Sequence, residues 1–231
     1  MGPAAEGWQM RFTVRPMQKD DVPQVMAIDR EAFPTQWPPP PFTRDLNNRL
    51  VRYLVAVDRS GGPDQGAEAL ASGERGNWQA LLSRLRQWFT RESPVGGSGQ
   101  EETVAGYAAM WLMVDEAHLT SIAVRKTYRR MGVGELLLIC MIDLAIKLKA
   151  RVMTLETRVS NREAQALYRK YGFSRVGIRR RYYSDDGEDA VIMTTENLTS
   201  ELYQARLRRL RQAYADRWVP ASQTLPSPLP D

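Results

Sequence analysis

The segment 122–138, IAVRKTYRRMGVGELLL, joins a strand to a helix through a basic loop with two glycines. A strand is expected to end at Val124, and Gly132 and Gly134 open an apolar helix expected to reach Lys149. A helix that is apolar nearly all round must be covered on most sides, as a helix lying on a sheet is. This segment therefore predicts an α/β fold.

The same loop suits a phosphate group. Glycines at a helix start let a ligand approach bare N–H groups, where the helix carries partial positive charge. Four basic residues surround the entry: Arg125, Lys126, Arg129 and Arg130. The spacing alone equally fits a glycine-relieved helix start with solvated basic side chains. A P-loop is excluded because its motif is absent. A dinucleotide fingerprint fits poorly because Leu137 replaces its third glycine, although Glu156 stands near the position of the ribose-binding acid.

The rest of the chain alternates strands and helices. Expected strands are 11–15, 53–57, 103–113, 117–124, 151–157, 173–180 and 189–195, and expected helices are 20–32, 43–50, 133–149, 160–171 and 199–218. This order predicts a mixed central sheet flanked by helices. We expect one domain at 11–198, a C-terminal helical extension at 199–218 and a disordered tail at 219–231.

Residues 58–103 interrupt this pattern and read as an insertion. Gly, Ser, Pro and acidic residues flank the stretch 77–91, whose apolar residues recur at helical spacing: Trp78, Leu81, Leu82, Leu85, Trp88 and Phe89. We predict an amphipathic helix there. Three roles stay open for it: cover for the domain's own apolar surface, contact with a partner protein or second subunit, and contact with a membrane surface.

Composition argues against several classes of protein. Cys140 and His118 are the single cysteine and histidine, whereas a structural zinc site needs about four such ligands, so no metal is expected. A net charge of +5 without a recognition motif predicts no specific nucleic-acid partner. The first residues lack the apolar core of a signal peptide. The longest apolar run, Leu136 to Ile142, is far too short to span a membrane. The expected location is the cytoplasm.

One motif resembles a known family. Residues 129–134, RRMGVG, match the [Q/R]-x-x-G-x-[G/A] acetyl-CoA motif of the GNAT superfamily of N-acetyltransferases. Three further segments, HLTSIAV, LETRVSNREAQALYRKYGF and RRRYYSDDGEDAVIM, resemble its N-terminal acetyltransferase branch, both RimI-like and Ard1-like. The likeness runs from about Thr103 to Asn197, is weaker over 11–57, and does not cover 58–102 or the tail. It implies a GNAT fold with acetyl-CoA as cosubstrate.

Acyl transfer from a thioester to an amine needs a proton acceptor, donors for the developing oxyanion and a proton donor for the thiolate. By position alone, Glu156 equally fits an acid paired with Arg158, and Tyr168 fits a core tyrosine. The resemblance implies instead that Glu156, in L-E-x-R-x-S-N, is the general base acting through water. It implies that Tyr168, in A-L-Y, is the general acid toward the coenzyme A sulfur.

The resemblance also implies the binding residues. Cofactor contacts are expected at Ile122, Ala123, Val124, Arg129, Arg130, Met131, Gly132, Val133, Gly134, Glu135 and Asn161. The backbone of the strand at Ile122 and Val124 is expected to pair with the pantetheine arm and to form the oxyanion hole. Acceptor contacts are expected at Phe33, Trp37, Tyr182, Tyr183 and Glu188, although aromatic packing in a hairpin also explains the two tyrosines. His118 and Cys140 are expected to be structural.

The implied reaction is acetylation of a protein's N-terminal α-amine by direct attack, without a covalent enzyme intermediate. An α-amine has a pKa of about 7.7–8.0, against about 10.4 for lysine, so it needs less help near neutral pH. The RimI likeness implies a ribosomal protein with N-terminal alanine as acceptor, and the Ard1 likeness implies broader protein substrates. Two alternatives stay open: a GNAT enzyme acting on lysine or a small amine, and a non-catalytic GNAT-fold binding module.

Overall fold

A computed structural model describes residues 11–35, 40–59 and 102–218 of the chain. Trp37, the expected helix at 77–91 and the expected tail lie outside the described residues. The strands are β1 (Phe12–Pro16), β2 (Val51–Asp58), β3 (Thr103–Met113), β4 (Glu116–Val124), β5 (Val152–Arg158), β6 (Phe173–Arg179) and β7 (Ala190–Thr195). The helices are α1 (Val22–Ala32), α2 (Phe42–Asp45), α4 (Val133–Lys147), α5 (Arg162–Lys170) and α6 (Glu201–Trp218).

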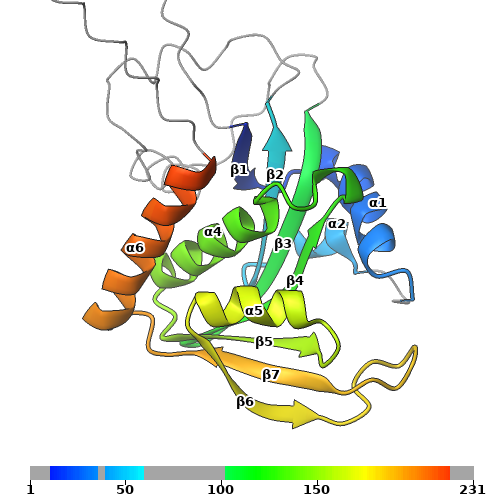
Figure 1. The fold of residues 1–231 in the computed structure, drawn as a ribbon. Coiled ribbons are helices and arrows are strands. Elements are labelled where there is room, and N and C mark those ends of the chain that lie inside the picture. Colours follow the sequence, from blue (N-terminus) through cyan, green and yellow to red (C-terminus); the bar gives the residue numbers. More distant parts are fainter. Residues whose placement is uncertain (1–10, 36–39, 60–101, 219–231) are drawn as a thin grey trace, which may run out of the picture.

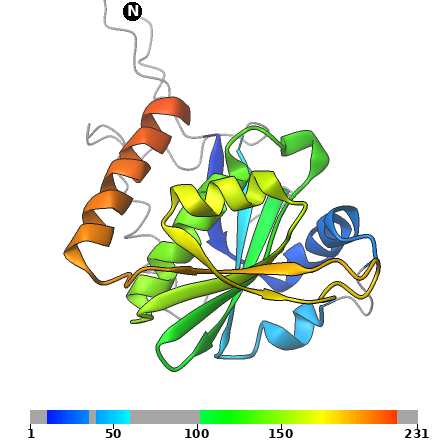
Figure 2. The ribbon, with the colours of Figure 1, turned by 60° about the horizontal axis from the view of Figure 1, so that its bottom comes forward.

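The described strands form one seven-stranded sheet in the order β1-β2-β3-β4-β5-β7-β6 (Figure 1). Only β4 and β5 run parallel among them, so the sheet is mixed. The loop between β6 and β7 reaches the segment that follows α1 (Figure 2). The predicted order of strands and helices is confirmed.

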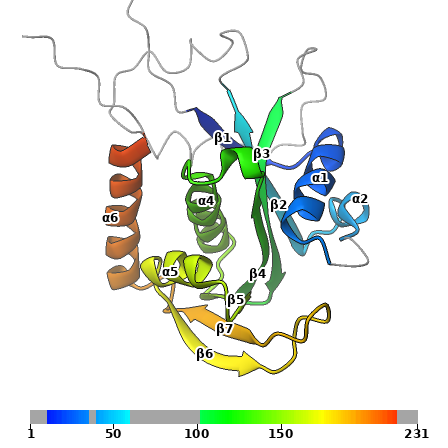
Figure 3. The ribbon, with the colours of Figure 1, turned by 45° about the vertical axis from the view of Figure 1, so that its right-hand side comes forward.

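Helices cover both faces of the sheet. Helices α1 and α2 lie on one face, α4 and α5 on the other, and α6 lies on the outer side of α4 (Figure 3). All side chains of α4 from Leu136 to Ala145 are buried, including Asp143, whose carboxylate pairs with Arg211 of α6. The helix predicted to be covered on most sides therefore lies between the sheet and α6.

Beta strands β4 and β5 part halfway along their length. Their ladder runs from Glu116 opposite Val152 to Leu119 opposite Leu155 and ends there. A bulge at Thr120 falls at the same point, in the pairing of β4 with β3. The bulge changes which face the side chains take, because Leu119 packs toward α4 whereas Ala123 packs toward α1. Beyond it, β4 and β5 are no longer hydrogen-bonded to each other, and we call the separation of their facing edges the gap.

Element ends differ from the prediction by a few residues, for local reasons. Helix α4 stops two residues early because Lys149 takes φ +65° and the N–H of Ala150 turns back to Ala145. Helix α2 has only four residues, since the Asn48 side chain accepts from the N–H of Leu50 and closes a turn. Helix α5 begins after Asn161, whose side chain caps it.

Two classes of feature are absent from the described residues. No helix among them is long and apolar enough to cross a membrane. Nor do they gather three or more His, Cys, Asp or Glu side chains in an arrangement that would hold a metal ion.

Candidate active site

The open edge of β4 presents backbone donors to the gap. Arg125 donates its N–H to the carbonyl of Ala105 on β3, at 2.9 Å. The direction of backbone N–H and C=O groups alternates along a strand. Ile122 and Val124 therefore direct their N–H and C=O groups away from β3, toward the gap, whereas Ala123 directs its groups toward β3. The expected cofactor strand therefore lies on the open edge, with two of its three residues presenting N–H groups there.

The glycine loop ends at the gap and opens α4. Gly132 is the N-cap, with φ +79°, and its carbonyl accepts from Leu136. The first-turn N–H groups of Val133, Gly134 and Glu135 precede that bond, so no earlier turn of the helix supplies their acceptors. Among the described residues, a Cβ at Gly134 would meet only Val124, at 3.5 Å, so they leave the backbone there approachable. This loop fits the pyrophosphate of a coenzyme.

Charged side chains surround the same helix start. Arg129 donates to the carbonyl of Val124 at 3.3 Å, and the exposed Arg130 lies 3.4 Å from Glu163 on α5. The Glu135 carboxylate turns toward α5 and accepts from the Tyr171 hydroxyl at 2.7 Å. Of the remaining expected cofactor residues, Met131 packs against the core beside α4. Asn161 uses its carbonyl oxygen to cap α5, accepting from Ala164 at 3.1 Å, so its amide nitrogen is the group left to face a cofactor.

Glu156 lies near the gap on the α1 face of β5. Leu155 packs toward α4, so its neighbour Glu156 points the other way. Its side chain is 6% exposed and both oxygens have partners: His118 Nε2 lies 2.8 Å from Oε2, and Arg179 Nη2 lies 3.2 Å from Oε1. Arg158, the partner considered from the sequence, pairs instead with the loop between β6 and β7.

A hydrogen-bonded row connects Glu156 to Glu116. Thr154 Oγ1 donates its one proton to Glu116 at 2.5 Å, so toward His118 Nδ1, 3.2 Å away, it can only accept. The hydrogen of that bond therefore sits on Nδ1. Glu156 Oε2 and His118 Nε2 then share one further proton, because two bare lone pairs would repel each other at 2.8 Å.

Tyr168 approaches from the α4 face. It packs against the core beside α4, and its ring centre lies 5.7 Å from that of Phe173. Burial raises the pKa of Tyr168 to about 12, and the nearby Tyr183 adds to the rise. The phenol therefore stays protonated near neutral pH, which is the form that can donate a proton. Glu156 and Tyr168 thus lie on opposite faces of the sheet.

Two loops join on the Glu156 side. Thr35, which follows α1, donates to Asp185 in the loop between β6 and β7, at 2.5 Å. Arg158 pairs with Asp185 at 2.6 Å, Asp186 at 2.8 Å and Glu188 at 3.0 Å. Hydrogen bonds from Arg158 and Thr35 hold the pKa of Asp185 well below its usual range. One guanidinium faces three carboxylates, so this cluster carries excess negative charge.

Three of the expected acceptor residues, Tyr182, Tyr183 and Glu188, lie at this cluster. The Arg158 guanidinium lies 4.0 Å from the ring centre of Tyr183, which meets Tyr182 edge-on. Burial raises the pKa of both tyrosines, and the charge of Glu156 adds to both shifts. Glu188 accepts from the N–H of Ser160. Phe33 ends α1 and packs against the core on that face.

Comparison with known proteins decides the family. The model of the acetyltransferase (GNAT) family matches residues 64–173. A putative ribosomal protein bS18-alanine N-acetyltransferase of Bacillus subtilis is 31% identical over 184 residues, covering 79% of this chain and 94% of the relative. The chain belongs to the GNAT family of acetyltransferases. This GNAT chain is therefore an acetyl-CoA-dependent N-acetyltransferase, and the glycine loop fits its cosubstrate.

Two further relatives agree. An N-alpha-acetyltransferase of Sulfurisphaera tokodaii is 29% identical over 185 residues, covering 79% of the GNAT chain and 91% of the relative. The crystal structure of the ribosomal-protein-S18-alanine N-acetyltransferase from Escherichia coli has a TM-score of 0.56 at 25% identity, covering 82% of this chain and 97% of its own. The predicted GNAT fold and the predicted family are confirmed.

Sequence reasoning missed the residues that hold the site together. His118 was expected to be structural, yet it contacts the expected base directly. Strand pairing could have indicated this contact. If β4 and β5 are parallel neighbours with His118 opposite Thr154, then His118 and Glu156 lie on the same face of the sheet. The bond from Thr35 to Asp185 joins residues 150 positions apart, and no local pattern announces it.

Proposed function

We propose that this GNAT enzyme acetylates the N-terminal α-amine of a protein, with Glu156 as proton acceptor and Tyr168 as proton donor. The observation that carries the proposal is that these two side chains lie on opposite faces of the sheet, with Glu156 next to the point where β4 and β5 separate. An amine can approach from the Glu156 face while the thioester sulfur lies on the Tyr168 face.

The proposed reaction balances without a covalent enzyme intermediate. The amine nitrogen attacks the acetyl carbonyl, the C–N bond forms and the C–S bond breaks. Glu156 takes the proton that the amine loses, through water, and Tyr168 gives its hydroxyl proton to the departing sulfur. The N–H groups of Ile122 and Val124 stabilise the carbonyl oxygen as it becomes negative. Glu156 then releases its proton to solvent and Tyr168 regains one.

Charge and shape on the acceptor side favour a chain terminus. A free α-amine near neutral pH is largely a cation, and the excess negative charge around Arg158 attracts it. The bond between Thr35 and Asp185 ties the segment after α1 to the loop between β6 and β7. Tyr182 and Tyr183 lie in that loop, where their rings suit contact with the first residues of an extended peptide.

The names of the relatives suggest the acceptor. The Bacillus subtilis relative is named for the alanine of ribosomal protein bS18, and the Sulfurisphaera tokodaii relative is an N-alpha-acetyltransferase. We therefore propose a ribosomal protein with N-terminal alanine as the acceptor, which implies action in the cytoplasm.

Peptide acetylation followed by mass spectrometry tests the proposal. The peptides carry alanine, serine, methionine or glutamate first, a free or blocked α-amine, and one internal lysine. We expect acetyl only on free α-amines, fastest with alanine. Acetyl on the internal lysine would move the enzyme to another acceptor class. Binding of acetyl-CoA without transfer to any peptide would favour a small-molecule acceptor or a binding role.

A further inference from the structure

The C-terminal helix α6 contacts both elements that border the cofactor side of the gap. Its buried side chains recur on one face: Tyr203, Leu207, Tyr214 and Ala215. The last turn reaches the glycine loop at the start of α4, and the first turns reach the end of α5. Tyr203 and Trp218 lie about 22 Å apart along a helix axis, so one rigid element spans both contacts.

At its C-terminal end, α6 packs against the loop glycine. A Cβ on Gly132 would lie 2.7 Å from the indole ring of Trp218, so the ring occupies the space that only a glycine leaves. The Tyr214 hydroxyl donates to the carbonyl of Gly132 at 3.4 Å. That carbonyl also accepts the first helical bond of α4, from Leu136. The backbone that presents the first-turn N–H groups is therefore supported from behind by α6.

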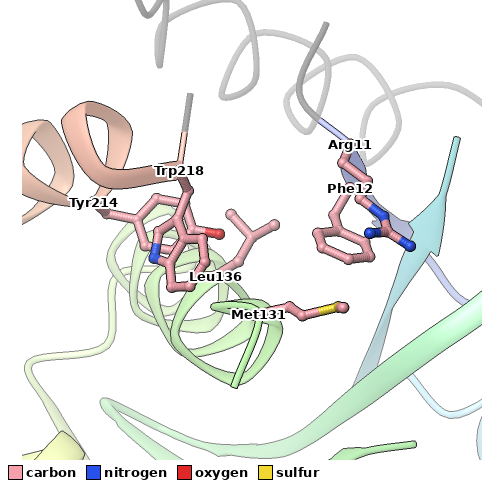
Figure 4. Close-up of a pocket in the computed structure, with 6 residues that line it drawn as sticks. All are labelled: Arg11, Phe12, Met131, Leu136, Tyr214 and Trp218. Carbon is pink, nitrogen blue, oxygen red and sulfur yellow. The ribbon is translucent and has the colours of Figure 1, made fainter. Parts of the chain in front are cut away.

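A cavity lies on the same side of the loop. Its volume is about 170 Å³, and its walls are Arg11 and Phe12 of β1, Met131, Leu136, Tyr214 and Trp218 (Figure 4). Neither Glu156 nor Tyr168 lines it, so it does not belong to the acceptor site. The cavity lies between β1 and the two aromatic residues of α6, Tyr214 and Trp218. Within the described residues, α6 and not the sheet therefore contacts Gly132 on this side.

At its other end, α6 repeats the contact on α5. A Cβ on Gly172, which has φ +87°, would lie 2.9 Å from the ring of Tyr203. The Tyr203 hydroxyl donates to the carbonyl of Tyr171 at 3.0 Å. Arg206 donates to the carbonyls of Arg169 and Lys170, both at 3.2 Å, and so caps the end of α5.

We propose that α6 is a positioning element, in which Trp218 holds the pyrophosphate loop and Tyr203 holds the end of α5, so that the cosubstrate is set against the gap. Gly132 at the start of α4 and Gly172 at the end of α5 both have left-handed backbone angles. An aromatic ring of α6 covers each of them. The role of Trp218 depends only on the use of acetyl-CoA, whereas the role of Tyr203 rests on the proposed function of Tyr168.

The test compares Trp218→Ala, Trp218→Phe and, as a control, Leu202→Ala, whose side chain is exposed on α6. Calorimetry with coenzyme A gives Kd, and steady-state kinetics separate the KM for acetyl-CoA from the KM for the acceptor peptide. We expect Trp218→Ala to weaken coenzyme A binding about tenfold, as contacting residues couple. The acceptor KM should stay within about twofold. Trp218→Phe keeps a ring over Gly132 and should restore most of the affinity.

Amide hydrogen exchange adds a readout that does not depend on turnover. In the coenzyme-free protein, Trp218→Ala should speed exchange at residues 132–136. In the wild-type chain, coenzyme A should slow exchange in the last turns of α6, because coupling between two sites is reciprocal. A folded Trp218→Ala variant with unchanged coenzyme A affinity and unchanged loop exchange would overturn the proposal. If that variant does not fold, lack of protection in wild-type α6 would overturn it. Failure of Tyr168 as acid would leave these binding results unaffected.

Discussion

His118 Nε2 and Glu156 Oε2 lie 2.8 Å apart, joining β4 to β5 at the point where the two strands separate. The row through Thr154 to Glu116 places the hydrogen of Nδ1, so this contact holds one exchangeable proton. The proposed base is thus one half of a hydrogen-bonded pair, so a change at His118 should affect turnover.

We predict that His118→Gln lowers kcat by about tenfold. Glutamine can still donate a hydrogen bond to Glu156 but cannot exchange a proton with it. The affinity for coenzyme A, measured by calorimetry, should stay the same. A wild-type kcat in this variant would show that the shared proton plays no part in turnover.

We predict that Glu156→Gln lowers kcat by about 10²–10⁴ without much change in acetyl-CoA affinity, because the amide cannot accept the amine's proton. Stopped assays with a free-terminus peptide give kcat, and calorimetry gives Kd. Glu201→Gln, at the exposed start of α6, is the matched control and should behave as wild type. If turnover were unchanged across pH, Glu156 would lose the role of base.

Tyr168→Phe tests the proton donor. We expect kcat to fall by about 10²-fold, since the thiolate must then leave without an acid. Because the pKa of Tyr168 is raised to about 12, its phenol keeps its proton as pH rises past the ordinary value near 10. Loss of Tyr168's proton should therefore not limit wild-type kcat at pH 9–10. A fall of kcat over that range in wild type that disappears in Tyr168→Phe would contradict this assignment.

Sequence patterns predicted the strands and helices well because their signals are local. The apolar run of α4 and the glycines at 132 and 134 reported burial and a helix start, and the structure has both. Glu156 and Tyr168 were identified through a sequence motif, and a motif does not indicate on which face of the sheet a side chain lies. That they lie on opposite faces follows from the strand alternation together with the place where β4 and β5 part.

Relationships between distant segments were beyond local patterns. The periodicity of α6 predicted a helix, but not that Trp218 would meet Gly132 or that Tyr203 would meet Gly172. Asp143 is a charged residue in an otherwise apolar stretch of α4, and the structure buries it against Arg211. Such contacts depend on how whole elements pack, and single-sequence spacing holds no record of that packing.

The two loop glycines should differ in what they tolerate. Gly132→Ala places a Cβ 2.7 Å from Trp218 on a backbone with φ +79°, so we expect at least a tenfold loss of acetyl-CoA affinity, or about 1.4 kcal/mol. Among the described residues, the new Cβ of Gly134→Ala meets only Val124, at 3.5 Å, in ordinary helical geometry, so the loss of affinity should be within about threefold. Calorimetry on both variants checks the order, and equal losses would mean that backbone approach by the ligand, rather than packing, sets the limit.

The bond between Thr35 and Asp185 should matter for the acceptor and not for acetyl-CoA. Asp185→Asn keeps the size of the side chain but weakens both the bond to Thr35 and the pair with Arg158, so we expect the acceptor KM to rise about fivefold. The KM for acetyl-CoA should not change. Asp186→Asn is the matched control, because Asp186 pairs with the same arginine but makes no hydrogen bond to the α1 side within the described residues.

The contacts of Asp185 with Arg158 and Thr35 also predict that acid destabilises the loop between β6 and β7. Arg158 and Thr35 lower the pKa of Asp185 in the folded state. The stability that the Asp185 carboxylate contributes is therefore fully present above its unfolded-state pKa of about 3.9. It is lost as the pH falls from there through the folded-state pKa. The measurement is hydrogen exchange in residues 183–189, corrected for the intrinsic pH dependence of amide exchange. In wild type the corrected rate should stay slow from pH 7 to about 5 and rise below about 4. In Asp185→Asn the corrected rate should already be faster at pH 7. Equal exchange in the two proteins at pH 7 would mean that this bond does not hold the loops together.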